Sequence, residues 1–171
     1  MSNLRSVPGI AKAQPNGSRT CPVDYDPRYL KVLPDEVLER DYGCGDPSRY
    51  VRAGETVLDL GSGGGKICFI ASQIVGPTGR VIGIDMNPDM LDLARRSAPV
   101  VAERIGHSNV EFHRGRIQDL QLGLDTVDTF LSQNPIRSTA DMTAYAAWER
   151  NIRSSVPMVP DNSVDVVVSN C

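Results

Sequence analysis

Two cysteines and two aspartates stand where their side chains are available for chemistry. Cys44 lies between two glycines, and Cys171 follows the valine-rich segment 164–168 with two residues between. Thiolates are soft ligands, so cysteines in such positions are candidates for binding a soft centre. Asp59 and Asp85 each lie at the end of an apolar segment. A carboxylate there can accept hydrogen bonds from the hydroxyl or ammonium groups of a ligand.

A glycine loop follows the first of these aspartates. Residues 59–65 read Asp-Leu-Gly-Ser-Gly-Gly-Gly, which contains G-x-G-x-G. The dinucleotide fingerprint G-x-G-x-x-G fails, because Lys66 takes its last position when counted from Gly61 and Cys68 does so from Gly63. Glycines allow backbone N–H groups and a helix start to approach a ligand closely. A carboxylate at the strand end repels a pyrophosphate and attracts cations. It therefore favours a ligand that carries an ammonium and a sulfonium and has no phosphate.

The second aspartate supports nucleoside binding. Asp85 lies about two dozen residues beyond Gly61, at the distance where an acid hydrogen-bonds ribose hydroxyls in nucleotide-binding α/β folds. This acid does not by itself distinguish a dinucleotide from S-adenosylmethionine.

These motifs together resemble those of the class I S-adenosylmethionine methyltransferases. The acidic strand end with G-x-G-x-G resembles the first motif, and Gly115–Leu120 resembles the third, with Arg116 in place of the usual Asp. The resemblance implies adenine contacts from the Ile117 backbone and the Gln118 side chain. The cofactor-binding residues that it implies are Asp59, Gly61, Ser62, Gly63, Gly65, Asp85, Met86, Ile117, Gln118 and Asn170.

Two further segments resemble the arsenite methyltransferases. These are residues 41–47, around Cys44, and residues 168–171, which end at Cys171; the match extends over about residues 34–120 and 160–171. The resemblance implies that both cysteines bind As(III) as the substrate, with Cys21 as a candidate additional thiol and Tyr42 as a wall beside the sulfonium. It also implies a further thiol beyond residue 171.

The implied chemistry needs a methyl donor and a reductant, and it needs no metal cofactor. The arsenic lone pair attacks the sulfonium methyl, so in-line positioning replaces a general base. Oxidation of the cysteines to a disulfide returns the pentavalent product to As(III), and thioredoxin or glutathione then restores the thiols. Two alternatives stay open: methyl transfer to another small-molecule nucleophile, and cofactor binding without catalysis.

Alternating strands and helices must position these groups. The pattern predicts strands over residues 55–60, 80–84, 109–113 and 163–169, with helices over 34–40, from Ile67 to Ile74, and from Asn87 onward. Such alternation predicts an α/β fold with parallel strands. The resemblance specifies a Rossmann-like class I methyltransferase sheet of order 3-2-1-4-5-7-6, truncated here after the fourth strand. We therefore expect that strand to be a bare edge and this chain alone to be inactive.

Three segments are predicted along the chain. Residues 1–33 are rich in Pro, Gly, Ser and Asn, which indicates a flexible N-terminal arm. Residues 34–171 form the incomplete cofactor-binding domain. Within it, about 121–160 is a helical insertion, with one amphipathic helix from Met142 to Ser154 that we expect to pack over the domain.

Composition excludes several classes of protein. Among 171 residues, 18 Lys and Arg stand against 21 Asp and Glu, and a net charge of -3 argues against nucleic-acid or acidic-membrane partners. No apolar run approaches the roughly 20 residues that span a bilayer. Four cysteines without a C-x-x-C pair indicate reduced thiols rather than a zinc ribbon or a disulfide framework. The prediction is a cytoplasmic enzyme.

Overall fold

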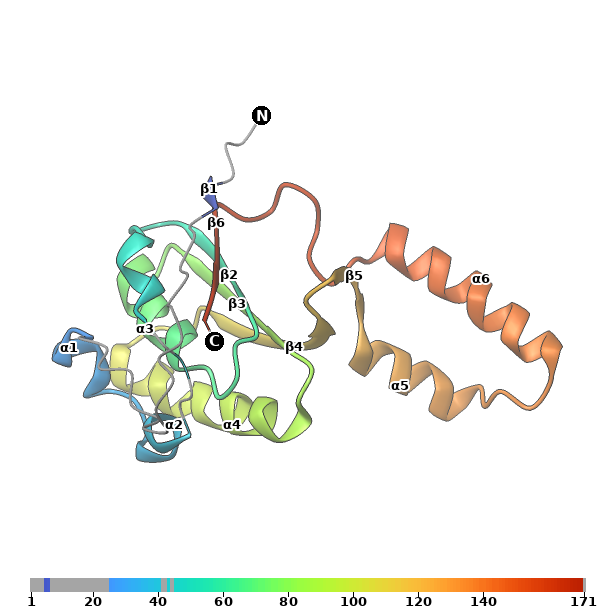
Figure 1. Ribbon diagram of the computed structural model, residues 1–171, viewed down its shortest axis with the longest axis horizontal. Helices are drawn as coiled ribbons and strands as arrows, with labels where there is room; N and C mark the ends of the chain where they lie inside the picture. Colours follow the sequence, from blue (N-terminus) through green and yellow to red (C-terminus); the bar gives the residue numbers. More distant parts are fainter. Residues whose placement is uncertain (1–4, 7–24, 41–42, 44, 171) are drawn as a thin grey trace, which may run out of the picture.

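The computed structural model describes residues 5–6, 25–40, 43 and 45–170. Within these residues six strands form one sheet in the order β1-β6-β2-β3-β4-β5 (Figure 1). The strands are β1 (Arg5–Ser6), β2 (Thr56–Leu60), β3 (Arg80–Asp85), β4 (Val110–Arg116), β5 (Asp119–Gly123) and β6 (Val166–Ser169). The helices are α1 (Pro27–Leu30), α2 (Asp35–Glu39), α3 (Lys66–Val75), α4 (Pro88–Ile105), α5 (Leu124–Gln133) and α6 (Thr139–Ser155), with a 3-10 turn at Pro47–Tyr50.

The central strands confirm the predicted fold class. Strands β4, β3, β2 and β6 are parallel and adjacent in that order, which is the expected 3-2-1-4 arrangement. The fourth strand begins at Val166, three residues later than predicted. Strand β5 was not predicted, and it pairs antiparallel with β4 after a two-residue turn. The crossover helices α3 and α4 have the apolar faces that the sequence indicated.

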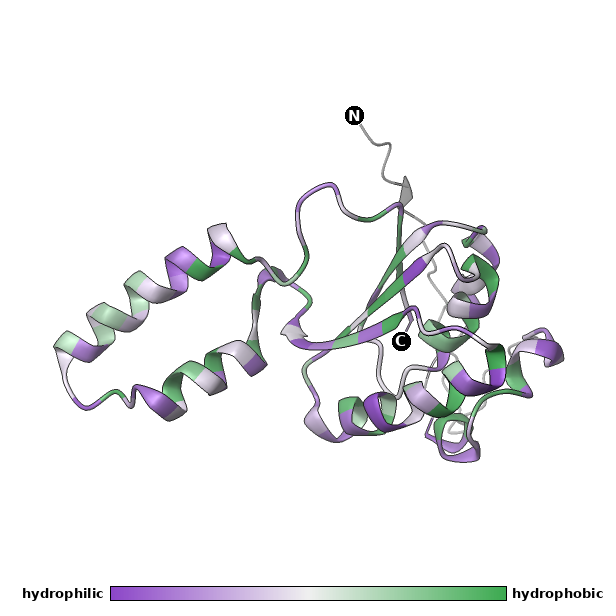
Figure 2. Ribbon diagram, turned by 180° about the vertical axis from the view of Figure 1, so that it is seen from behind, coloured by the Kyte–Doolittle hydropathy of each residue, from purple (hydrophilic) through white to green (hydrophobic). Residues whose placement is uncertain are grey.

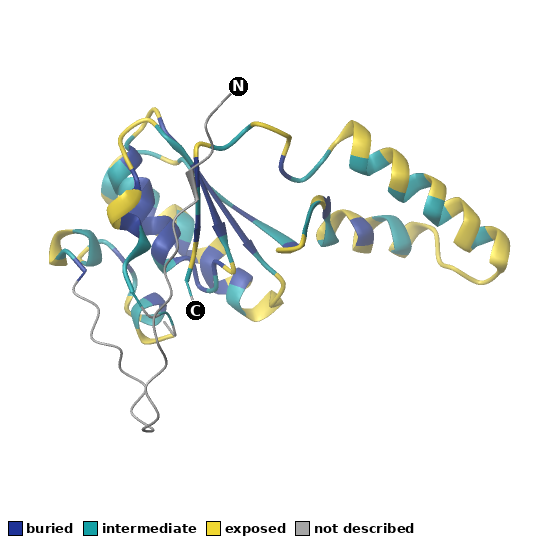
Figure 3. Ribbon diagram, turned by 45° about the horizontal axis from the view of Figure 1, so that its top comes forward, coloured by how far each residue is buried: buried dark blue, intermediate teal, exposed yellow. Residues whose placement is uncertain are grey.

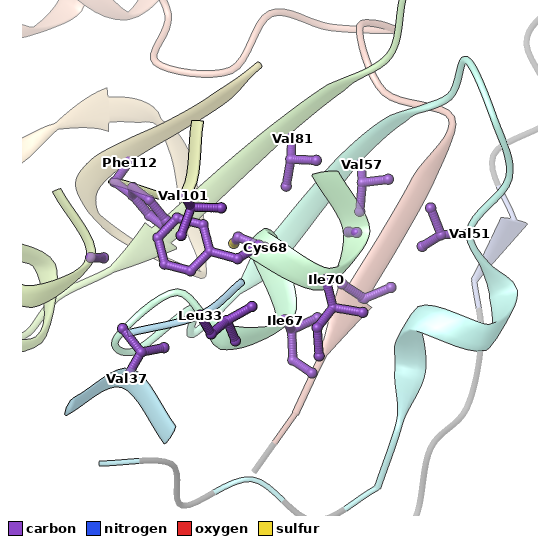
Figure 4. Packing of buried hydrophobic residues seen from close by; sticks show 14 of the residues in the cluster. Leu33, Val37, Val51, Val57, Ile67, Cys68, Ile70, Val81, Val101 and Phe112 are labelled. Atoms are coloured by element: carbon purple, nitrogen blue, oxygen red, sulfur yellow. The ribbon is translucent and has the colours of Figure 1, made fainter. Parts of the chain in front are cut away.

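Alternation along the strands divides the core between the two faces of the sheet. On one face, Val57 and Val81 pack with the buried residues of α3 and α4, such as Ile70 and Val101 (Figures 3 and 4). On the other face, Leu58, Ile82 and Ile84 form a second cluster with Val159. Successive residues of a strand point to opposite faces, so one apolar run supplies both clusters.

Part of the segment assigned to the arm is folded onto the domain. Residues 25–33 contain α1, which lies against α3, and both Tyr25 and Leu33 are buried in the first core cluster. Burial of these two side chains holds the segment on the domain, although the composition around them is typical of a loop. Strand β1 pairs in parallel with β6, opposite Val166 and Val167, so the expectation of a bare β6 edge is wrong.

The insertion forms two helices that extend away from the sheet. Helices α5 and α6 project beyond β5, on the side remote from α1 (Figure 1), and α6 has no buried residue. Their aromatic contacts include Phe130 stacked on Trp148, with ring centroids 4.0 Å apart. The expected single helix packed over the domain is therefore wrong. Aromatic side chains contact one another between the two helices of this hairpin, and both helices contain apolar as well as polar residues (Figure 2).

No helix in the described part of the chain combines the length and the apolar character that crossing a membrane requires.

Candidate functional site: the glycine loop and its carboxylates

The glycine loop between β2 and α3 is held against β3. The backbone N–H groups of Gly61 and Ser62 both donate to the Ile84 carbonyl, at 2.8 and 2.9 Å. Gly61, Gly63 and Gly65 have φ angles of 80°, 53° and 88°, values that favour glycine. The loop therefore turns sharply at the carboxyl end of β2, where open α/β sheets bind their ligands.

Asp85 ties this loop to the start of α4. One carboxylate oxygen accepts from the Gly63 N–H and the other from the Asn87 N–H, both at 2.8 Å. The Asn87 side chain in turn caps α4. The acid predicted to bind ribose thus lies at the rim of the glycine loop, with its orientation set by two backbone donors.

Asp59 is a buried carboxylate with one oxygen available. Only 2% of the residue is exposed, its Oδ2 accepts from the Cys68 thiol at 3.3 Å, and its Oδ1 has no hydrogen-bond partner among the described residues. Burial, opposed by the hydrogen bond from Cys68 and assisted by the charge of Asp85, raises the pKa of Asp59 to about 7. A buried polar atom without a partner indicates a place where a ligand donor is accepted.

A cavity of about 120 Å³ lies over the loop, and Asp59 is part of its wall. Its lining comes from α2 and the residues that follow it, from β2, the glycine loop, the start of α3 and α4, and from the residue after β6: Val37, Arg40, Gly43, Asp59, Gly61, Ser62, Gly63, Gly64, Lys66, Ile67, Met90 and Asn170. The Ser62 hydroxyl is buried and also lacks a partner among the described residues. These features fit a ligand that brings an ammonium group and polar oxygens.

Sequence reasoning missed several residues of this cavity. Lys66 and Met90 line it, and the Lys66 ammonium lies 3.8 Å from the centroid of the Tyr25 ring. Lys66 directly follows the glycine motif, which is the signal that identifies it. Val37 of α2 and Arg40, which directly follows that helix, also line the cavity, and no local motif marks them.

The structure brings some predicted cofactor residues together and leaves others apart. Asp59, Gly61, Ser62, Gly63 and Asn170 share the cavity wall, whereas Met86 is 62% exposed and does not line it. Gly65 forms the N-terminal cap of α3.

The proposed adenine contacts lie in a turn. Ile117 and Gln118 form the exposed link between β4 and β5, and neither is among the residues that line the cavity.

The predicted arsenic ligands Cys44, Cys171 and Cys21, and also Tyr42, lie outside the described residues. Their neighbours in sequence are nevertheless joined. The Asn170 side chain donates to the Gly45 carbonyl at 3.1 Å, and the Tyr25 hydroxyl donates to the same oxygen at 2.7 Å. The Ser169 hydroxyl donates to the Leu60 carbonyl, so the end of β6 lies beside the glycine loop.

Comparison with known proteins agrees with this geometry. A family model described as a methyltransferase domain matches residues 52–156, which is more than half of the chain. The chain belongs to this methyltransferase family. The matched range includes β2, the glycine loop, Asp85 and the helical hairpin.

Among its relatives are arsenite methyltransferases. The enzyme of Aquipseudomonas alcaligenes is 37% identical over 131 residues, which are 72% of this chain and 38% of the relative. The enzyme of Halobacterium salinarum is 47% identical over 92 residues, which are 53% of this chain and 22% of the relative. The solved arsenic(III) S-adenosylmethionine methyltransferase of Chlamydomonas reinhardtii is 29% identical with a TM-score of 0.56, over 85% of this chain and 38% of that one. The chain thus spans less than two fifths of the length of each. The predicted resemblance is confirmed.

Proposed function

We propose that this methyltransferase transfers a methyl group from S-adenosylmethionine to As(III) held by thiolates. The observation that carries the proposal is the hydrogen bond between Gly45 and Asn170, each of which is one residue from a predicted arsenic ligand. It links the loop that contains Cys44 to the end of β6 at the rim of the cavity, since Asn170 also lines that cavity. The names of the relatives support arsenic as the substrate.

The cofactor half of the proposal rests on the described residues. Asp59 accepts the ammonium of the amino-acid end through Oδ1, and the glycine loop allows the chain to pass close to the ligand. Asp85 exchanges a backbone partner for ribose hydroxyls when the cofactor binds. The family and the solved relative, which is named as an S-adenosylmethionine enzyme, support this donor.

In the proposed transfer, the arsenic lone pair forms the As–C bond while the bond between the sulfonium sulfur and its methyl carbon breaks. Sulfur keeps that electron pair, so S-adenosylhomocysteine leaves and arsenic is formally oxidised from +3 to +5. Two thiolates return two electrons to arsenic as they form a disulfide. Thioredoxin or glutathione then reduces that disulfide.

The test is arsenic binding, because it reports directly on the thiolate ligands. X-ray absorption of the protein with arsenite is expected to show arsenic coordinated by sulfur. Cys44→Ser and Cys171→Ser are each expected to remove one sulfur and to weaken binding by at least tenfold. The same variants should bind S-adenosylhomocysteine as the unmodified chain does, which controls for folding.

Two results would contradict the arsenic assignment. The first is arsenic coordinated only by oxygen in the unmodified chain, and the second is unchanged sulfur coordination in both variants. In either case, retained binding of S-adenosylhomocysteine would favour another small-molecule nucleophile as the methyl acceptor.

A further inference from the structure

A buried thiol–carboxylate pair connects the core to the cofactor cavity. Cys68 is fully buried in the first turn of α3, and its Sγ lies 3.3 Å from Asp59 Oδ2 on β2. Burial and the neighbouring carboxylate raise the pKa of Cys68, so its sulfur carries a proton and is the donor of this hydrogen bond. The sequence alone assigned Cys68 only to packing.

The glycine at position 83 leaves space for this sulfur and for a neighbouring ring. Gly83 of β3 pairs with Asp59 in the sheet, and a Cβ placed on Gly83 would lie 2.6 Å from Phe112 Cδ1 and 2.9 Å from Cys68 Sγ. A side chain at this position would therefore displace both the Phe112 ring and the sulfur. Figure 4 shows Cys68 at the centre of the core, between α3 and the strands.

The hydrogen bond leaves the two carboxylate oxygens of Asp59 in different situations. Oδ2 is engaged by the thiol from the core side, whereas Oδ1 is buried without a partner among the described residues. Asp59 is also part of the cavity wall. One oxygen is thus used to orient the group and the other is left for a ligand.

We propose that Cys68 is a positioning residue, whose thiol holds Asp59 so that Oδ1 receives the ammonium of the cofactor's amino-acid end. The inference rests on the proposed function, because it takes S-adenosylmethionine as the ligand. Cys68 itself touches neither the cofactor nor the reacting atoms. Its effect is confined to ligands that carry the amino-acid group.

A matched pair of variants separates this role from packing. Cys68→Ala and Cys68→Ser both remove sulfur and leave side chains of similar size, and only serine keeps a donor for Asp59. Calorimetry measures the affinity of each protein for S-adenosylhomocysteine and for 5′-methylthioadenosine. The second ligand has the same nucleoside and a thioether but no amino-acid group.

We expect Cys68→Ala to weaken S-adenosylhomocysteine binding roughly five- to tenfold, since a hydrogen bond to a charged group is lost. Binding of 5′-methylthioadenosine should change by less than about twofold, because this ligand has no amino-acid group to contact Asp59. Cys68→Ser should restore most of the lost affinity. In an Asp59→Asn background, Cys68→Ala should cause little further loss, because the two residues act through one contact.

The proposal is overturned if alanine and serine behave alike, if Cys68→Ala weakens both ligands equally, or if its effect is undiminished in the Asp59→Asn background. Each of these results assigns Cys68 to packing while cofactor binding stands. If the unmodified chain binds neither ligand, the cofactor assignment fails instead, and the inference fails with it.

Discussion

At the scale of single residues, burial of the Asp59 carboxyl lowers the stability of the ligand-free folded protein at neutral and higher pH. Its pKa is raised from 3.8 to about 7, mainly because burial disfavours the charged form. The folded state therefore binds more protons than the unfolded chain between these two values, and stability falls as pH rises through that window. A shift of this size corresponds to a loss on the order of 4 kcal/mol by pH 8. In the proposed complex, the ammonium group of the cofactor would offset this loss.

Asp59→Asn is accordingly expected to stabilise the ligand-free protein at pH 8 by about 1–3 kcal/mol, because asparagine has no charge to bury. The difference from the unmodified chain should shrink toward pH 4, where Asp59 is protonated. Urea unfolding at pH 4.5, 6 and 8 measures it. Asp92→Asn is the control, since that side chain is 77% exposed, and it should show no comparable pH-dependent gain. A lower stability of Asp59→Asn at pH 8 would contradict the linkage.

At the scale of elements, the glycine loop connects the cavity to the packed core. Gly65, at the start of α3, lies against the aromatic pair Phe69 and Phe112, whose ring centroids are 5.5 Å apart. A Cβ at Gly65 would lie 2.7 Å from Phe112 Cζ and 3.0 Å from Phe69 Cε2. At Gly61 the same atom would have no neighbour within 4 Å. The two glycines share a left-handed backbone but not their surroundings.

Gly65→Ala and Gly61→Ala therefore separate backbone strain from steric overlap. Each places alanine at a positive φ, which costs about 1–2 kcal/mol. Gly65→Ala adds the displacement of two buried rings, typically about 1–3 kcal/mol more. Urea unfolding of both variants measures the difference. Equal losses would mean that the aromatic pair moves aside without cost.

At the scale of the whole molecule, the contacts that the described residues show between the helical hairpin α5–α6 and the sheet lie at the base of the hairpin. Arg95 pairs with Asp125 at 2.5 Å, Arg114 pairs with Asp128, and Val127 is the buried residue of α5. Next to the base, the N–H groups of Met158 and Val159 donate to the carbonyls of Gln121 and Leu120. Arg153 of α6 also pairs with Asp119 of β5 at 2.6 Å, so both α6 and the chain that follows it contact β5.

Replacement of residues 124–155 by a short Gly-Ser linker should leave the cofactor site intact. None of the residues that line the cavity belongs to the hairpin. We expect a loss of stability of about 1–3 kcal/mol, from Val127 and the partly exposed ion pairs. Calorimetry with S-adenosylhomocysteine should give an affinity within about twofold of the unmodified chain. A large loss of affinity would show that the hairpin supports the cavity.

Local pattern was enough to predict the central strands, α3, α4 and the order of the cofactor motifs. Apolar spacing and the glycine and proline signals report directly on the local backbone, as residues 59–65 and Asn87 illustrate. The same spacing shows which face of a helix is apolar, but it does not show what covers that face. For this reason the folded segment 25–33, the pairing of β1 with β6 and the outward direction of α5 and α6 emerged only from the structure.

The site divides in the same way. Asp59 and Asp85 are identified by their positions at strand ends, so the sequence by itself determined which carboxylates lie beside the glycine loop. The contact of Cys68 with Asp59, and that of Gly45 with Asn170, join different elements whose relative placement depends on how α3 and β6 dock on β2. Only the tertiary structure decided those contacts, because a hydrogen bond between elements requires distances and angles that no single segment encodes.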